Sequence, residues 1–194
     1  MITKPNFSKI TALVVDDDHY STEILQQILR GFGLTRCTVV NTAAEAKEII
    51  LKGHTDLIIC EATIRDEKYG DFIGWLRKST ANPIRFTPVV MLTGYTQMTN
   101  VTGARDNGAN SVVKKPVSPK VLFDHLVWSA SQERPFVETE VFSGPDRRFK
   151  FIGPPDGVGR RDSDVSAEIG AATAPNMTQQ ELDSTFKPTR VSIE

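Results

Sequence analysis

The sequence predicts a doubly wound α/β protein built on a five-stranded parallel sheet. Three observations support this fold class. Five short apolar runs lie within the first 131 residues, and each is followed by an amphipathic, helix-like segment. The runs are continuously apolar rather than alternating, which is typical of strands covered by helices on both faces. Five strand–helix units in this length of chain make one domain of ordinary size.

The first unit consists of a strand over 10–15 and a helix over 20–33. The apolar face of the helix is formed by Leu25, Ile28, Leu29 and Phe32. These positions recur at helical spacing, so they are expected to face the core. Gly33 is the expected end of the helix, since glycine readily adopts the left-handed conformation of helix ends.

The second and third units follow the same pattern. A strand over 37–40 precedes a helix that begins with Thr42 and Glu45, whose spacing is that of a capping box. A strand over 56–60 then precedes a helix over 71–80. The apolar face of this third helix is formed by Phe72, Ile73 and Leu76.

The last two units complete the domain. A strand over 88–92 is followed by a weaker helix over about 97–107, and a strand over 111–113 is followed by the fifth helix. Ser118 is the expected N-cap of that helix and Pro119 its first residue, because proline has no amide hydrogen to leave unsatisfied there.

The character of the sequence changes after residue 131. We therefore divide the chain into a domain over 8–131, an arginine-, proline- and glycine-rich extension over 132–165, and a tail over 166–194. The extension has no long periodic segment, so we expect it to be irregular. The tail composition predicts disorder, apart from a short helix around Thr178–Asp183.

Overall composition excludes several classes of protein. The formal net charge is −1, so there is no global attraction to nucleic acid or to a membrane. We expect no signal peptide and no membrane span. Cys37 and Cys60 adjoin apolar positions, which favours buried free thiols in a reducing compartment. These features together predict a cytoplasmic location.

Polar side chains follow four of the predicted strands. Asp16 and Asp17 follow the first, Glu61 the third, Thr93 the fourth and Lys115 the fifth. In an open parallel sheet, ligands bind beyond the carboxyl ends of the strands, so these side chains mark a candidate site. Crowded carboxylates need a cation between them, either a divalent ion or the lysine. Oxygen ligands select a hard ion such as Mg²⁺, for which the ligands would be Asp16, Asp17 and Glu61.

The motifs "LVVDDD", "PVVMLTGY" and "SVVKKP" resemble, in order and spacing, the receiver domain of bacterial response regulators, the CheY-like family. The resemblance covers residues 8–131 and implies the flavodoxin-like sheet of that family. It also implies a signalling protein of a two-component phosphorelay.

The resemblance also implies a role for each residue. Asp16 and Asp17 would hold Mg²⁺, Thr93 would hydrogen-bond a phosphoryl group, and Lys115, preceding a cis-proline at Pro116, would pair with it. The phosphoacceptor of the family is an aspartate, and its position here is Glu61.

Glutamate has the same charge as aspartate on a side chain one methylene longer. That displaces the carboxylate from the position needed for attack on a phosphoryl donor, and misplacement by about 1 Å costs roughly a hundredfold in rate. We therefore expect a pseudo-receiver, in which Glu61 holds the domain in an active-like state.

Three further positions depart from the pattern: Val112 replaces the switch aromatic, Gly94 replaces alanine, and "IRDEKYG" replaces the usual loop. Two alternatives remain. In one, the chain is an ordinary phosphorelay receiver phosphorylated on Glu61 or on Asp66. In the other, the sheet edge is only a scaffold with a residual ion-pair cluster.

The extension contains two related stretches, in which a phenylalanine, a Gly-Pro turn, an acid and an arginine pair recur. Arginine pairs bind phosphates bidentately and stack on bases. These stretches resemble the arginine-rich extension of CheY-like cyclic di-GMP effectors. The residues that would bind the nucleotide are Arg147, Arg148, Arg160, Arg161 and Asp164. A solvated linker and, less favoured, a nucleic-acid arm are the alternatives.

The sequence has no catalytic pair and no DNA-binding motif after the domain, so we expect a non-enzyme that acts through protein contact. The family implies the face formed by the fourth helix, fifth strand and fifth helix, over about 97–126. The candidate contact residues are Tyr95, Val112, Val121 and His125. The implied partner is a histidine kinase or a flagellar motor switch component.

Overall fold

The structure is a computed structural model that describes residues 7–80, 83–131, 136–139, 142–146 and 178–180. A five-stranded parallel sheet lies at its centre, with the strand order β2-β1-β3-β4-β5. The strands are β1 (Thr11–Val15), β2 (Arg36–Val40), β3 (Leu57–Glu61), β4 (Val89–Thr93) and β5 (Ser111–Lys114). This sheet confirms the predicted fold class and all five predicted strands.

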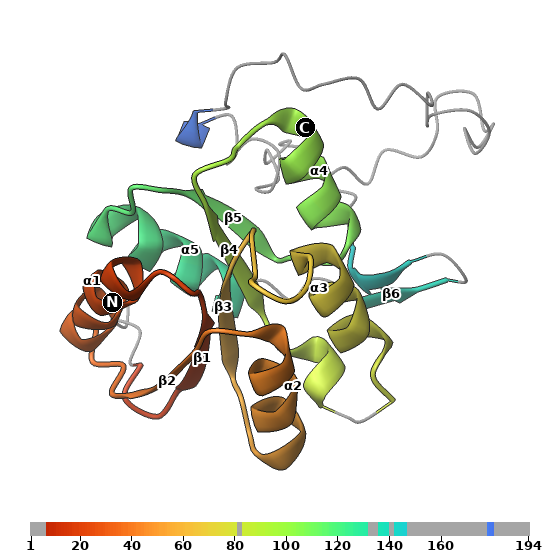
Figure 1. Cartoon of the computed structure of the whole chain (residues 1–194), viewed down its shortest axis with the longest axis horizontal. Helices are drawn as coiled ribbons and strands as arrows, with labels where there is room; N and C mark the ends of the chain where they lie inside the picture. The colour runs from red at the N-terminus through yellow and green to blue at the C-terminus, as the bar shows by residue number, and fades with distance from the viewer. Residues whose placement is uncertain (1–6, 81–82, 132–135, 140–141, 147–177, 181–194) are drawn as a thin grey trace, which may run out of the picture.

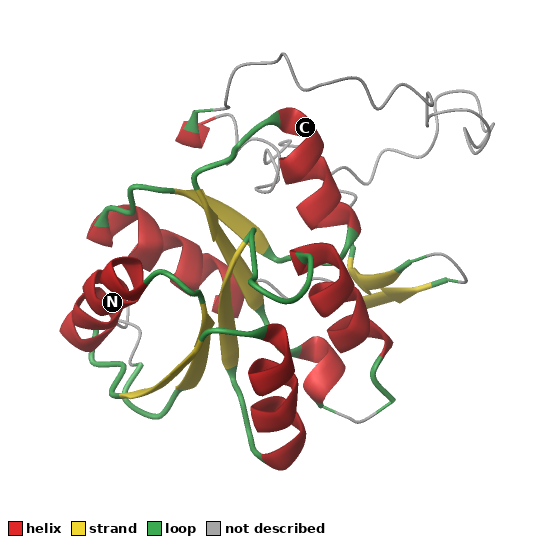
Figure 2. Cartoon of the chain, viewed as in Figure 1, coloured by secondary structure: helices red, strands yellow, loops and turns green. Residues whose placement is uncertain are grey.

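Helices cover both faces of the sheet (Figures 1 and 2). They are α1 (His19–Gly31), α2 (Ala43–Lys52), α3 (Tyr69–Lys78), α4 (Met98–Asp106) and α5 (Pro119–Ser131), with a short 3₁₀ helix, η1 (Ile84–Phe86), before β4. Helices α1 and α5 pack on one face, and α2, α3 and α4 pack on the other (Figure 1). None of the described helices is both long enough and apolar enough to cross a bilayer.

The two faces of the sheet form two halves of the core. Along β1, Leu13 and Val15 point towards the cluster that contains Phe72 of α3, whereas Ala12 and Val14 point towards the opposite cluster, with α1 and α5. Successive strand side chains face opposite sides, so a strand buried on both sides is apolar at every position. This is why the predicted strands appear in the sequence as continuous apolar runs.

The predicted helix ends are also confirmed. Gly33 has φ +86° just beyond α1. The backbone N–H of Glu45 donates to Thr42 Oγ1 at 3.2 Å, at the start of α2. At the start of α5, the backbone N–H of Val121 donates to Ser118 Oγ at 3.2 Å. These caps satisfy amide groups that have no partner inside their own helix.

The start of the extension differs from the prediction. Instead of an irregular chain, the described residues form an antiparallel hairpin of β6 (Phe136–Glu138) and β7 (Ser143–Pro145). It packs beside α3 and η1, where the Phe86 and Phe136 rings meet edge to face with centroids 4.7 Å apart. Three-residue strands are too short to leave a periodic pattern in the sequence, so tertiary contacts decide this element.

Most of the tail, for which disorder was predicted, lies outside the described residues. The same is true of most of the predicted helix around Thr178–Asp183. Residues 178–180 are described, and 179 and 180 are helical.

Candidate functional site

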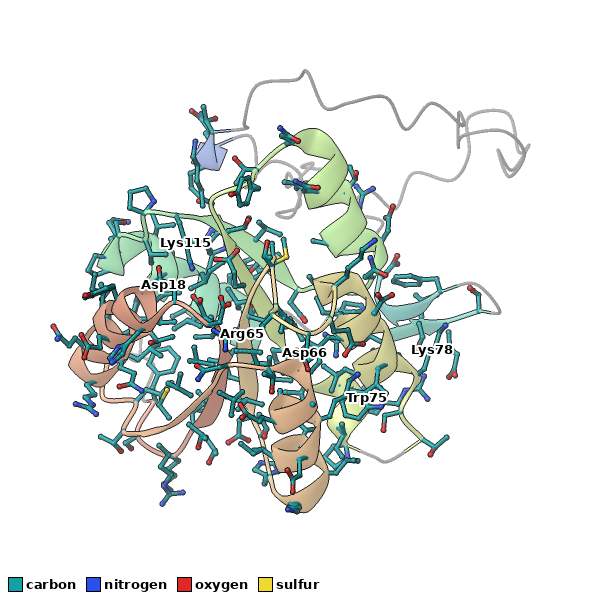
Figure 3. All side chains as sticks on the ribbon, in the orientation of Figure 1. Asp18, Arg65, Asp66, Trp75, Lys78 and Lys115 are labelled. Atoms are coloured by element: carbon teal, nitrogen blue, oxygen red, sulfur yellow. The ribbon has the colours of Figure 1, made fainter. Side chains whose placement is uncertain are left out.

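The predicted side chains meet at the carboxyl edge of the sheet. Asp16 follows β1, Glu61 ends β3, Thr93 ends β4, and Lys115 follows β5. In Figure 3, Lys115, Asp18 and Arg65 lie along this edge. The peptide bond between Lys115 and Pro116 is cis, as the family resemblance implied. The parallel register brings the four strand ends together, and this juxtaposition was predictable from strand order alone.

Lys115 joins the two buried carboxylates. Its Nζ donates to Asp16 Oδ2 at 2.7 Å and forms a second ion pair with Glu61 Oε2. Burial by itself would lower the pKa of Lys115, but hydrogen bonds and charge attraction from Asp16 and Glu61 outweigh it, so the pKa is raised. The ammonium therefore stays charged and holds the ends of three strands together.

Both carboxylates accept further hydrogen bonds from the chain. The backbone N–H of Asp18 donates to Asp16 Oδ1 at 2.9 Å, and Ser21 Oγ donates to Asp16 Oδ2 at 3.1 Å. Glu61 Oε1 accepts from its neighbour's backbone, Ala62 N, at 2.7 Å. The glutamate thus folds back along the end of β3, and its carboxylate is fully engaged by groups of the chain.

Asp17 does not join this cluster. Its carboxylate pairs with Arg65 of the β3–α3 loop, with Arg65 Nε 3.5 Å from Asp17 Oδ2. Neither Arg65 nor Ser21 was predicted from the sequence. Ser21 lies in the first turn of α1 and Arg65 lies in a loop of unpredicted shape, so neither had a spacing signal that would single it out.

The predicted magnesium ligands are therefore not gathered as the prediction requires. In the part of the chain that the structure describes, no group of three or more His, Cys, Asp or Glu side chains is arranged to hold a metal ion. The Lys115 ammonium takes the position between Asp16 and Glu61. The residues as arranged do not fit Mg²⁺, and the assignment of Asp16, Asp17 and Glu61 as metal ligands stays a prediction.

Thr93 is fully buried at the end of β4, and its Oγ1 accepts from the backbone N–H of Tyr95 at 2.9 Å. This bond fixes the turn after β4. A hydroxyl both accepts and donates, so Thr93 could hold the turn and donate to an anion at once. Its predicted role in a phosphoryl pocket is compatible with this position and stays a prediction.

Asp66, the alternative phosphoacceptor, lies elsewhere. Its two oxygens accept from the backbone N–H groups of Ala43 at 2.7 Å and Ala44 at 3.1 Å, at the start of α2. The hydrogen bond from Ala43 is the main cause that lowers the pKa of Asp66. The neighbouring Glu67 pairs with Lys47 of the same helix. The β3–α3 loop is thus tied to α2, and Asp66 acts as a helix cap rather than as a member of the Lys115 cluster.

Two candidate partner contacts are buried. Val112 is fully buried in the core, so it cannot touch a partner directly. His125 is 1% exposed and has Gln179 Nε2 3.2 Å from its Nε2, so it cannot touch a partner while Gln179 is in place. Although β5 is an edge strand, helices cover both faces of the sheet there, and Val112 packs in the core beneath them. The sequence does not reveal this burial. Tyr95 is 65% exposed and Val121 is partly exposed, so both remain candidates. The predicted nucleotide ligands, Arg147, Arg148, Arg160, Arg161 and Asp164, lie outside the described residues.

Comparisons with known proteins agree with the fold. The family model of the response regulator receiver domain matches residues 12–127. Transcriptional regulatory protein ZraR of Klebsiella oxytoca is 29% identical over 150 residues, which are 75% of this chain and 31% of that protein. DNA-binding response regulator MtrA of Mycolicibacterium smegmatis is 31% identical over 110 residues, which are 57% of this chain and 46% of that protein.

A solved response regulator of Chloroflexus aurantiacus superposes with a TM-score of 0.58 at 25% identity, covering 64% of this chain and 100% of its own. Chemotaxis protein CheY4 of Vibrio cholerae superposes with a TM-score of 0.56 at 23% identity, covering 62% of this chain and 98% of its own. The chain spans less than half the length of ZraR and MtrA, so the match concerns one part of those proteins.

Proposed function

Because this chain belongs to the response regulator receiver domain family, we propose that it acts in two-component signalling as a pseudo-receiver that is not switched by phosphorylation. The observation that carries this proposal is the ion pair between Glu61, at the phosphoacceptor position, and Lys115. In a receiver that is phosphorylated, the lysine pairs with the incoming phosphoryl group. Here the longer glutamate takes that pairing permanently.

The chemistry of the acceptor supports the same proposal. To attack a phosphoryl donor, an oxygen of Glu61 has to be exposed and aligned with the leaving group. One oxygen accepts from Ala62 N and the other is paired with Lys115, and the side chain is 12% exposed. One of these two interactions has to break before Glu61 can attack. The cluster therefore favours a fixed state over a phosphorylation cycle.

The output would be protein contact in the cytoplasm, through the surface of α4, β5 and α5. The partner class that the family suggests is a histidine kinase or a flagellar motor switch component, and the chain would not act as an enzyme. Tyr95, at the mouth of the site and largely exposed, is the contact residue that the structure supports best.

The test is acetyl phosphate with Mg²⁺ added to the full chain, read by intact mass. We expect no phosphoryl adduct on the wild type, and an adduct on a Glu61→Asp variant, in which the shorter side chain releases Lys115. Glu67→Asp is the matched control, since it makes the same change in the neighbouring loop and should take up nothing. An adduct on wild-type Glu61 would support the alternative, an ordinary phosphorelay receiver that binds Mg²⁺.

A second, separate proposal concerns the extension. The repeated arginine pairs suggest that Arg147, Arg148, Arg160, Arg161 and Asp164 bind cyclic di-GMP. It rests on the sequence alone, because these residues lie outside the described ones. Calorimetric titration of the full chain with cyclic di-GMP should show micromolar binding that an Arg147→Ala/Arg148→Ala variant loses. Absence of heat in the wild type would leave the extension as a linker.

A further inference from the structure

A short segment of the tail lies against the end of β5 and the side of α5. Gln179 is 65 positions after Lys114, yet its Oε1 accepts from the backbone N–H of Lys114 at 3.0 Å. Its Nε2 lies 3.2 Å from Nε2 of His125 in α5. One amide side chain therefore contacts both elements of the surface where the partner is proposed to bind. The segment is the blue piece in Figure 1.

The position of β5 explains why this contact forms. β5 is an edge strand of the sheet, with β4 on one side only. The backbone N–H of Lys115 donates to Thr93 of β4 at 2.8 Å, whereas that of Lys114 donates to Gln179. An edge strand offers outward N–H groups to any acceptor that can reach them, and the Gln179 amide takes one of these groups.

The geometry also settles how the amide is oriented. A backbone N–H only donates, so the group that faces Lys114 has to be the oxygen of Gln179. The NH₂ group then faces His125 and has to donate to it. In this arrangement His125 Nε2 is the acceptor, so we expect the ring to be in the Nδ1–H form. Both the acceptor and the donor of the Gln179 amide therefore have a partner here. A chance surface contact would not be expected to pair both groups.

Gln179 also lines a small pocket beside the Lys115 cluster. The pocket has a volume of about 140 Å³ and is lined by Lys114, Lys115, Pro116, Ser118, Val121 and Gln179. Lys115 thus belongs both to the carboxylate cluster and to the lining of this pocket. Val121, a partly exposed candidate for partner contact, lies in the same lining.

From these contacts we infer that the β5–α5 edge is a docking site for the chain's own segment 178–180, and that this segment and a protein partner exclude each other. The exclusion rests on the proposed function, but the docking does not. The segment and the β5–α5 edge belong to the same chain, in which residues 147–177 come between the hairpin and the segment. The contact is intramolecular, so its population does not depend on protein concentration.

The experiment uses the full ¹⁵N-labelled chain and compares Gln179→Ala with the matched control Gln180→Ala. Gln180 is exposed, so Gln180→Ala makes the same substitution one residue away. In Gln179→Ala we expect the Lys114 amide resonance to shift and its hydrogen exchange to become roughly fivefold faster, the loss of one ordinary hydrogen bond. Gln180→Ala should leave both unchanged. Gln179 lies outside the sheet and its helices, so neither variant should unfold the domain.

The His125 ring gives an independent readout. Long-range ¹H–¹⁵N spectra should show the Nδ1–H form in the wild type and in Gln180→Ala, with the Nε2 resonance shifted in Gln179→Ala. Equal Lys114 exchange and equal His125 spectra in all three proteins would overturn the docking. A Lys114 shift that changes on dilution would overturn it too, since the occupant would then be a second copy. Uptake of phosphoryl on Glu61 would affect only the proposed function, because no docking readout depends on it.

Discussion

At the scale of single residues, Lys115 supplies the positive charge between two carboxylates. Its side chain is 21% exposed, and it neutralises Asp16, at 4%, and Glu61, at 12%. Desolvation makes buried charges costly, so a carboxylate pair at this depth requires a cation nearby. A lysine meets that requirement without a cation from solution, and it cannot dissociate from the protein.

A Lys115→Met variant tests this directly. The free energy of unfolding should fall by roughly 1–3 kcal/mol at pH 7, less than for a fully buried pair, because solvent screens a partly exposed ammonium. Mg²⁺ should recover part of the loss in the variant and change the wild type little, since only the variant leaves the carboxylates without a cation. Urea unfolding with and without Mg²⁺ measures both effects.

Lys120→Met is the control, because Lys120 pairs with Asp124 on α5 and is 85% exposed. Its unfolding free energy should stay within about 0.5 kcal/mol of the wild type. A Lys115→Met protein as stable as this control would contradict the bridging role.

The raised pKa of Lys115 predicts a pH dependence. A lysine that binds its proton more tightly in the folded state stabilises the fold fully below its unfolded value, 10.5, and this contribution is lost as pH rises through the higher folded value. The stability difference between the wild type and Lys115→Met should therefore be constant from neutral pH to near 10.5 and shrink above it. Urea unfolding over this pH range is the measurement, and a difference that shrinks well below 10.5 would count against the assignment.

At the scale of elements, Arg77 and the β6–β7 hairpin close the amino end of the sheet, opposite the site. Arg77 is 1% exposed, and its guanidinium donates to four oxygens of the neighbouring loops. The acceptors are the carbonyls of Gly108, Arg85 and Thr87 and the side-chain oxygen of Asn110. Burial lowers the pKa of Arg77 to about 9, so the group is still charged at neutral pH.

The hairpin docks directly onto this arginine. Ser143 Oγ donates to the backbone carbonyl of Arg77 at 2.8 Å, and Arg85 pairs with Glu138 at 3.0 Å. The hairpin therefore lies on the side of α3 and η1, away from the site.

Gly144→Ala should loosen this docking. A Cβ at Gly144 would lie 3.0 Å from Gly108 Cα and 3.0 Å from the Phe142 ring, and backbone cannot yield cheaply. We expect the free energy of unfolding to fall by roughly 1–2 kcal/mol, in the range of overpacked sites, with faster hydrogen exchange in β7. Gly94→Ala is the control, because its Cβ would have no neighbour within 4 Å. Equal stability of the two variants would show that the hairpin is not packed as described.

At the scale of the whole molecule, the central strands are sealed by both helical layers. Cys60 on β3 is 1% exposed, and burial, with the nearby Glu61 charge, raises its pKa to about 12. Cys37 lies on the edge strand β2 and is partly exposed, and burial raises its pKa as well. Reagents attack the thiolate, so the two thiols report on opening of the centre and of the edge of the sheet.

We expect a thiol reagent at pH 8 to modify Cys37 first and Cys60 only as fast as the whole domain unfolds. The Cys60 rate should rise with urea as global unfolding does, because β3 is paired with a strand on each side. Mass spectrometry of the labelled protein, with Cys37→Ser and Cys60→Ser variants to assign the sites, measures both rates. Rapid labelling of Cys60 without denaturant would contradict the sealed core.

The sequence by itself determined the five strand–helix units, their caps and the edge of the sheet at which Asp16, Glu61, Thr93 and Lys115 meet. These features depend on local periodicity and on strand order, both of which are written along the chain. Glu61 at the acceptor position was also evident, because it is a matter of residue identity.

Only the tertiary structure decided which partner each charged group takes. Lys115 between Asp16 and Glu61, Asp17 turned to Arg65, Asp66 on α2, and Gln179 on β5 each depend on side-chain directions and on segments far apart in sequence. Val112 and the hairpin were mispredicted for the same reason. Short polar contacts contribute about 1 kcal/mol each and leave no periodic pattern, so they emerge only when the packed core has placed their partners within reach.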